Sequence, residues 1–175
     1  MFNLGNFLAY QLAWFAVILG AAAGRAWLGA TVALLVTAAH LWLRRDRFEL
    51  RLVALCALIG VLVDSTLAMT GQVRFAAAWP ADLAPYWMVS LWIVFATTLN
   101  HSLRWLMRRP VAAALAGAAG GPLAYLAGAK LGALTLTTPA TTLPLIALLW
   151  TPAMIALSMI VLRASKTPAA GRLPV

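Results

Sequence analysis

Residues 51–71 read RLVALCALIGVLVDSTLAMTG, an apolar stretch that begins at an arginine and ends at a glycine. About 20 apolar residues suffice to cross a bilayer as an α-helix, so this stretch predicts a transmembrane helix. It contains one carboxylate, Asp64, at a depth where a charged side chain costs about 3 kcal/mol on insertion scales. Such a residue faces a bundle interior, a partner or a water-filled cavity, which makes Asp64 the first candidate functional residue.

The composition of the whole chain also indicates a membrane protein. Of its 175 residues, 64% are hydrophobic and 10% are charged, whereas a soluble domain has roughly 25% charged residues. The formal net charge is +9, but the basic residues lie near the ends of apolar stretches, which argues against nucleic-acid binding. The one cysteine, Cys56, excludes an internal disulfide and a multi-cysteine metal site.

Apolar stretches bounded by charged or turn-forming residues predict an all-α fold, a polytopic bundle of six transmembrane helices. The expected spans are residues 4–23, 26–43, 52–70, 86–106, 111–129 and 143–162. These spans form a single transmembrane domain over residues 1–163, followed by a short tail over residues 164–175. The first span lacks a basic segment before it and a convincing cleavage site, so we expect it to be retained.

The basic residues predict the topology of these spans. With the N-terminus in the cytoplasm, only Arg25, Arg74 and Lys130 lie on the opposite side, and the other ten basic residues fall in cytoplasmic segments. Cytoplasmic loops of membrane proteins carry an excess of Lys and Arg. We therefore expect both termini to be cytoplasmic, with the short tail on that side.

The fifth expected span has an unusual number of small residues. Gly117 and Gly121 are four residues apart, a spacing that lets another helix approach closely. Pro122 removes a backbone donor from the same helix. Tight helix packing is the first interpretation, and a broken helix that lines a binding cavity is the alternative.

Polar side chains within the expected spans form two layers. The outer layer contains Asp64, Tyr125 and Lys130, and a pair of Asp64 with Lys130 or Arg74 is one arrangement that the sequence leaves open. A structural hydrogen bond or ion pair is the plain interpretation of Asp64. The alternative is a site for a proton or a substrate.

The inner layer lies near the expected cytoplasmic ends of the helices. Its polar residues are interpreted first as interhelical hydrogen-bonding partners and interface anchors. They include the candidate functional residues Asn6, Gln11, Asn100 and His101, together with His40.

Motifs with an established chemistry are missing from the sequence. There is no HExxH, histidine box, GxSxG, P-loop or dinucleotide fingerprint. The two histidines have no carboxylate at a ligand spacing, so the sequence predicts no metal and no cofactor. Catalytic residues stay unassigned, and a non-enzymatic role is favoured.

Three segments carry a resemblance to a known family. They are NFLAYQLAWFAVILGA (residues 6–21), PYWMVSLWIVFATTLNHSLRWL (85–106) and GAAGGPLAYLAGAKLGA (117–133). Through them nearly the whole chain resembles the domain of unknown function 2878 family of small bacterial inner-membrane proteins. The resemblance implies a multi-pass protein of that membrane, has no established activity to transfer, and hints at fatty-acid or lipid modification.

Three functional hypotheses follow. The first is a non-catalytic accessory protein linked to membrane lipid or fatty-acid modification. The alternatives are a small proton-coupled transporter with Asp64 as its coupling carboxylate, and an intramembrane lipid-modifying enzyme. The expected partners are membrane lipids, a membrane or lipid-modifying enzyme, or a second copy of the chain, and not nucleic acid.

Overall fold

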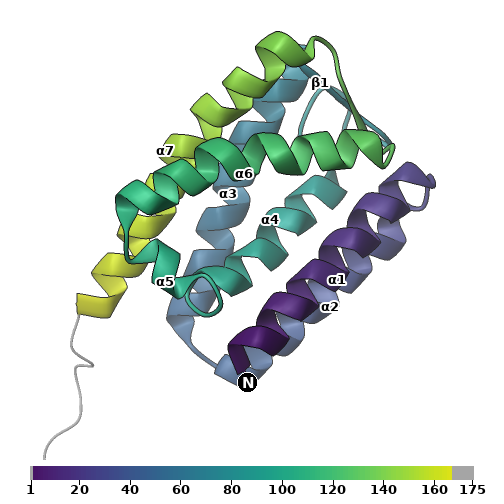
Figure 1. Ribbon diagram of the computed structural model, residues 1–175. Helices are drawn as coiled ribbons and strands as arrows, with labels where there is room; N and C mark the ends of the chain where they lie inside the picture. The colour runs from purple at the N-terminus through teal and green to yellow at the C-terminus, as the bar shows by residue number, and fades with distance from the viewer. Residues whose placement is uncertain (1, 167–175) are drawn as a thin grey trace, which may run out of the picture.

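The computed structural model describes residues 2–166, so residues 167–175 of the expected tail lie outside the described part. The chain folds as a helical bundle with one small antiparallel strand pair (Figure 1). The elements, in chain order, are α1 (Phe2–Ala22), α2 (Ala26–Arg44), α3 (Arg47–Met69), β1 (Val73–Phe75), α4 (Tyr86–Leu99), α5 (Arg104–Met107), α6 (Pro110–Lys130), β2 (Leu134–Leu136) and α7 (Pro139–Lys166).

Five helices, α1, α2, α3, α6 and α7, are long and apolar enough to cross a membrane. Their outward surfaces carry large apolar side chains: Leu12 is 71% exposed, Leu115 67% and Leu148 69%. Extended apolar surfaces of this kind mark contact with a membrane or a partner. The expected helical membrane fold is confirmed in this respect.

The expected fourth span, residues 86–106, is not one continuous helix. α4 ends at Leu99 after 14 residues, a length of about 21 Å at 1.5 Å per residue, against a hydrocarbon core of about 30 Å. Asn100–Leu103 form a turn before the four-residue α5. Asn and Ser side chains compete for backbone hydrogen bonds and favour turns over helix interiors. The prediction of an unbroken fourth span is therefore wrong.

Two other helices, α3 and α7, begin four or five residues earlier than expected. α3 begins at Arg47 because the Asp46 side chain caps it, accepting a hydrogen bond from the Phe48 backbone N–H at 2.8 Å. This start places Glu49 in the first helical turn. α7 begins at Pro139, a residue that suits a first helical turn because its missing N–H has no partner there in any case.

The helices pack in a definite order. The α1–α2 pair lies against α4, α4 lies against α3, α3 contacts α7, and α7 pairs with α6 (Figure 1). The start of α1 and the end of α7 lie at the same end of the bundle, opposite the strands. We call these the terminal end and the strand end.

The strand pair joins the loops at the strand end. β1 pairs with β2 in antiparallel register, with Arg74 opposite Thr135. Thr142 on α7 donates a hydrogen bond to the Gln72 side-chain oxygen at 2.8 Å. The loop after α3 is thereby fastened to the α6–α7 connection, which fixes the α6–α7 pair relative to α3.

Small residues allow α6 and α7 to pack closely. A Cβ atom at Gly117 would lie 2.8 Å from the Trp150 carbonyl oxygen, and one at Gly121 would lie 2.5 Å from Trp150 Cγ. α6 continues through Pro122 without interruption. Tight packing is confirmed, and the alternative of a broken fifth span is wrong.

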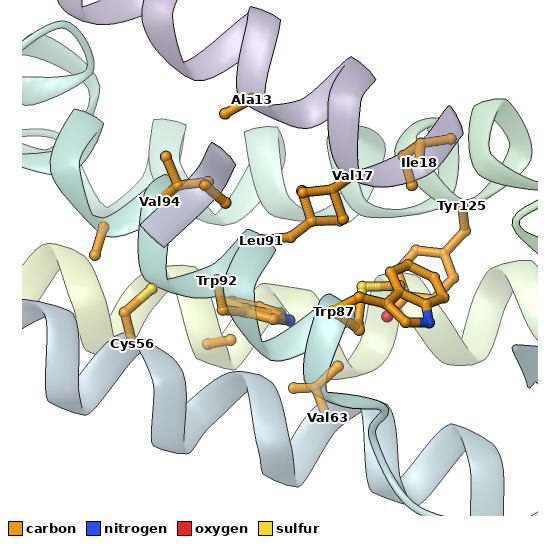
Figure 2. Close-up of a cluster of buried hydrophobic side chains, with 14 of the residues drawn as sticks. Ala13, Val17, Ile18, Cys56, Val63, Trp87, Leu91, Trp92, Val94 and Tyr125 are labelled. Carbon is orange, nitrogen blue, oxygen red and sulfur yellow. The ribbon is translucent and has the colours of Figure 1, made fainter. Parts of the chain in front are cut away.

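The buried core is centred on α4. Figure 2 shows Leu91 of α4 beside Val17 of α1, with Trp92 directed toward α3. Trp87 is fully buried at the start of α4, and its indole N–H donates to the Ala76 carbonyl at 2.9 Å. The shortest of the six hydrophobic helices is thus the most deeply enclosed.

Replacing Gly29 by Ala should destabilise the fold, because the new Cβ would overlap the backbone of Ala16 and Val17 on α1. We expect the free energy of unfolding to fall by about 1–3 kcal/mol, measured by reversible denaturation in detergent with circular dichroism. Gly120→Ala is the matched control, because its Cβ meets no atom within 4 Å. Equal stability of the two variants would contradict the close α1–α2 packing.

Candidate functional site

Asp64 is the centre of a buried hydrogen-bond cluster. Its side chain is fully buried on α3. Oδ2 accepts a hydrogen bond from Trp92 Nε1 of α4 at 2.7 Å, and Oδ1 accepts one from the Tyr125 hydroxyl of α6. Three helices that are distant in sequence therefore meet at one carboxylate, and both of its oxygens have a donor.

The structure brings Asp64 and Tyr125 together as two members of the expected outer layer. It does not pair Asp64 with Lys130 or Arg74, whose side chains are both exposed at the strand end. Lys130 is the last residue of α6, whereas Asp64 points into the bundle between α4 and α6. Asp64 therefore accepts hydrogen bonds from two neutral side chains, Trp92 and Tyr125, and forms no ion pair with Lys130 or Arg74.

Two stacked indoles extend this cluster to α7. The ring centroids of Trp92 and Trp150 are 4.5 Å apart with an interplanar angle of 30°. A Cβ at Gly60 would overlap the Trp92 ring, and Gly121 leaves similar space for Trp150. The two rings thus lie between a glycine of α3 and a glycine of α6, and each ring requires the absence of a side chain behind it.

An aromatic pocket lies beside the stack, with a cavity volume of about 50 Å³. Helices α1, α4, α6 and α7 supply most of its walls, and Leu134 of β2 closes the strand end. The other lining residues are Tyr10, Trp14, Ile18, Met88, Leu91, Trp92, Phe95, Ala124, Tyr125 and Trp150.

One polar atom at this pocket has no partner. Trp150 Nε1 is buried and makes no hydrogen bond among the described residues. The Tyr125 hydroxyl interacts with this N–H; it donates its proton to Asp64, and its oxygen keeps lone pairs that can accept from the indole. A buried N–H without a well-formed hydrogen bond costs about 1–3 kcal/mol, so an additional acceptor in the pocket would stabilise this indole.

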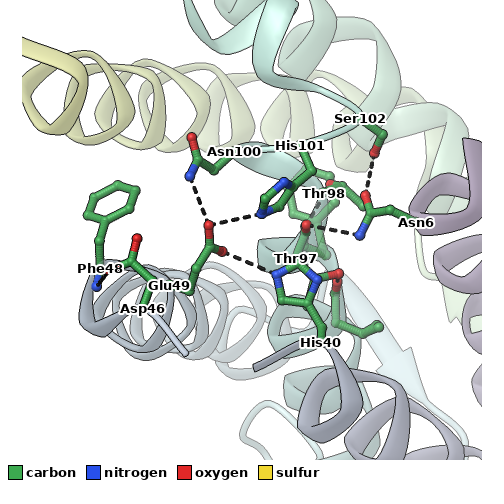
Figure 3. Close-up of polar contacts among 12 residues, drawn as sticks. Asn6, His40, Asp46, Phe48, Glu49, Thr97, Thr98, Asn100, His101 and Ser102 are labelled. Carbon is green, nitrogen blue, oxygen red and sulfur yellow. Dashed lines mark hydrogen bonds and ion pairs between the residues drawn. The ribbon is translucent and has the colours of Figure 1, made fainter. Parts of the chain in front are cut away.

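A second polar cluster occupies the terminal end. Glu49, 2% exposed, lies between His40 and His101 (Figure 3). Glu49 Oε2 is 3.3 Å from His40 Nε2, and Oε1 is 3.0 Å from His101 Nε2. Asn100 Nδ2 donates to Oε1 at 2.8 Å. The two imidazoles and the carboxylate are the residues of the described part that could together hold a metal ion.

The start of α1 covers this cluster. The Phe2 ring meets the His101 ring edge-on with centroids 5.2 Å apart, and the Arg44 guanidinium lies 4.9 Å from the Phe2 centroid. Asn6 donates to the Thr97 carbonyl at 3.1 Å and accepts from the Ser102 hydroxyl at 2.7 Å. These contacts hold the turn after α4 in place, and that turn positions His101.

The structure brings together three residues of the expected inner layer and adds a carboxylate, Glu49, that was not expected there. His40, Asn100 and His101 converge, whereas Gln11 is half-buried and forms no part of the cluster. Sequence reasoning missed Glu49, because it was placed in a charged connection before the third span. A sequence signal did exist: Asp46 predicts a helix start, which puts Glu49 next to the end of the preceding helix and His40.

Comparison with known proteins gives one match. A family described as "Protein of unknown function (DUF2878)" matches residues 3–156, most of the chain. No curated protein matches, and no solved structure matches. The family match confirms the resemblance of the sequence segments and brings no activity with it.

Tyr125→Phe should lower the free energy of unfolding by about 1–3 kcal/mol, because it removes a donor from a buried carboxylate. Combined with Asp64→Asn, the loss should be smaller than the sum of the two single losses, since both changes remove the same bond. Denaturation in detergent gives the free energy of unfolding of all four proteins in this double-mutant cycle: the wild type, the two single variants and the double variant. Tyr86→Phe, at a tyrosine that is 36% exposed, should change stability by less than about 0.5 kcal/mol. Strict additivity would contradict the direct Asp64–Tyr125 interaction.

Proposed function

The chain belongs to the DUF2878 family, and we propose that the aromatic pocket binds the carboxyl or ester end of an acyl chain of a membrane lipid, together with its first methylene groups. In this proposal the protein acts as a non-catalytic accessory protein of lipid or fatty-acid modification. The observation that carries the proposal is an apolar pocket between α1, α4, α6 and α7, of which α1, α6 and α7 are long enough to cross a membrane. The pocket is lined by Trp150, whose buried indole N–H makes no hydrogen bond that meets ordinary geometry among the described residues.

The position of the pocket favours a ligand that arrives from the bilayer. Tyr10 and Trp14 on α1, Ala124 on α6 and Trp150 on α7 are only partly buried, so the pocket is accessible between these helices. α1, α6 and α7 are apolar helices of membrane-spanning length. An opening between such helices faces hydrocarbon, where acyl chains are the most abundant small apolar groups.

The chemistry of the lining favours a chain that carries an oxygen. Aromatic and aliphatic side chains suit methylene groups, with polarity confined to a few placed groups, as is usual in ligand pockets. Trp150 Nε1 makes no hydrogen bond of ordinary geometry among the described residues and is a donor available to a ligand oxygen. A carboxyl or ester oxygen at the end of an acyl chain can accept a hydrogen bond from this N–H, whereas a plain hydrocarbon cannot.

The same lining supports binding more than catalysis or transport. Its residues include no serine, cysteine, histidine or carboxylate that could act as nucleophile or base. Asp64 lies behind the Trp92 and Tyr125 side chains with both oxygens occupied, which suits a positioning group better than a coupling carboxylate. An accessory role requires a partner, and we propose that this partner is a lipid-modifying enzyme of the same membrane.

We further propose six crossings of a bacterial inner membrane, with both termini in the cytoplasm. α4 continues through its turn into α5, and the two together complete the short fourth crossing. The start of α1 and the end of α7 lie at one end of the bundle. That end also carries Arg44, Arg47 and Arg104 at helix boundaries, in agreement with an excess of positive charge on the cytoplasmic side.

A photoreactive fatty acid tests the binding proposal. Protein in nanodiscs is irradiated with a diazirine-bearing palmitic acid, and labelled peptides are mapped by mass spectrometry. We expect labelling on α1, α4 and α7 peptides that line the pocket, and competition by unlabelled palmitic acid. A phospholipid with the same chain forms a second competitor, and hexadecane, which has no oxygen, a third. The order of competition identifies whether the free acid or the lipid ester is the ligand.

Two variants localise the effect. Ala124→Phe should fill the pocket and abolish specific labelling, whereas Ala119→Phe, on the exposed surface of the same helix, should leave it unchanged. Trp150→Phe keeps the ring but removes the N–H, and should weaken competition by palmitic acid about fivefold, the equivalent of about 1 kcal/mol for a hydrogen bond. Equal labelling of the Ala124 and Ala119 variants, or equal competition by hexadecane, would refute the proposal.

A further inference from the structure

We infer that His40, Glu49 and His101 form a binding site for one divalent transition-metal ion, of the zinc or ferrous iron class. This inference concerns a cluster separate from the aromatic pocket. It does not depend on the proposed lipid ligand, because no residue is shared between the two sites.

The donor set is the first argument. Two imidazoles and one carboxylate form the ligand set of many catalytic zinc sites and of mononuclear ferrous sites. Calcium and magnesium prefer oxygen ligands alone, so the two histidines select a transition metal. Cys56 is buried elsewhere in the core and adds no thiolate to the set.

The distances are the second argument. Atoms bound to one metal at about 2.0–2.2 Å lie about 3.0–3.5 Å from one another. The two carboxylate-to-imidazole distances, 3.0 and 3.3 Å, already fall in this range. All three donor atoms lie within 4.8 Å of one another, so a small rotation of the side chains would allow them to share one ion.

The surroundings are the third argument. Asn100 holds the carboxylate through a 2.8 Å hydrogen bond, as an outer partner holds a metal ligand. His40 lies in the last turns of α2, Glu49 lies in the first turn of α3, and His101 lies in the turn after α4. Irregular backbone within a membrane bundle is tolerated where it is enclosed by protein or lines a cavity, and here it delivers the third ligand.

Hydrogen bonding alone is the competing explanation. In that case each histidine donates its Nε2 proton to Glu49, and the cluster only ties three segments together. When a metal binds, each neutral imidazole instead carries its proton on Nδ1 and offers the Nε2 lone pair to the ion. The two explanations differ in whether an added ion is bound and whether it stabilises the protein.

Cobalt(II) provides the test, because its visible absorption reports coordination by nitrogen and oxygen. The full chain is purified with a histidine-free affinity tag, treated with chelator and titrated with cobalt(II), then with zinc(II) as competitor. We expect one cobalt per chain, displacement by zinc, and an increase of the melting temperature on binding. Iron(II) under anaerobic conditions is the third arm, and its competition against zinc distinguishes the two metals.

Variants decide between the explanations. Glu49→Gln keeps an oxygen for hydrogen bonding but loses the charge, and should abolish the cobalt spectrum and the metal-dependent melting shift. Asn100→Ala should weaken cobalt binding about tenfold. Asp82→Asn is the control: it removes an exposed carboxylate at a positive φ of 60°, a conformation that Asn accepts, and should change nothing.

Two results would overturn the inference. One is the absence of stoichiometric cobalt binding to the folded wild type. The other is binding that persists equally in the Glu49→Gln, His101→Gln and Asp82→Asn variants. If Glu49→Gln does not fold, two other measurements decide between a metal site and hydrogen bonding alone. They are the number of cobalt ions bound per wild-type chain and the cobalt affinity of the Asn100→Ala variant.

Discussion

The arrangement of this bundle depends on the buried carboxylate of Asp64, which needs hydrogen-bond donors from the protein. Asp64 lies in an apolar helix, where water is not available to solvate it. Trp92 and Tyr125 are its donors, and each comes from a different helix. Because an indole and a phenol reach it only from fixed positions, α4 and α6 can take up few positions along α3. The two glycines behind the stacked indoles follow from the same requirement, since a side chain at either position would displace a ring.

α4 serves both polar clusters, and its short length follows from that double role. Trp92 near its middle reaches Asp64, and the turn after Leu99 carries Asn100 and His101 to Glu49. A helix continued through residues 100–103 would place these side chains about 100° apart around its axis. The turn lets two consecutive residues reach the same carboxylate. The break in the helix after Leu99 therefore brings Asn100 and His101 together at Glu49.

The sequence was sufficient for the helical membrane fold, because apolar length reports directly on burial in lipid. The sequence also placed Asp64 and Tyr125 at a similar depth in the membrane, because depth follows from counting residues along a helix. It could not identify Trp92 as the partner of Asp64, because adjacency around a bundle depends on which helices pack together. Glu49 was missed for a different reason: a charged residue near a predicted helix end is normally solvated, and only the fold shows it enclosed between two histidines.

Stability alone is a poor explanation for two buried carboxylates in so small a bundle. Interhelical hydrogen bonds in membranes contribute about 0.6 kcal/mol on average, and apolar replacements of buried polar networks are often neutral or stabilising. What such networks do provide is a defined position for the groups they hold. Asp64 fixes the indole and phenol that form one wall of the aromatic pocket, and Glu49 aligns two imidazole nitrogens. Asp64 accordingly acts as a positioning group for side chains whose other faces line the pocket, whereas Glu49 holds the two imidazole nitrogens beside its own oxygens, as a shared metal site requires.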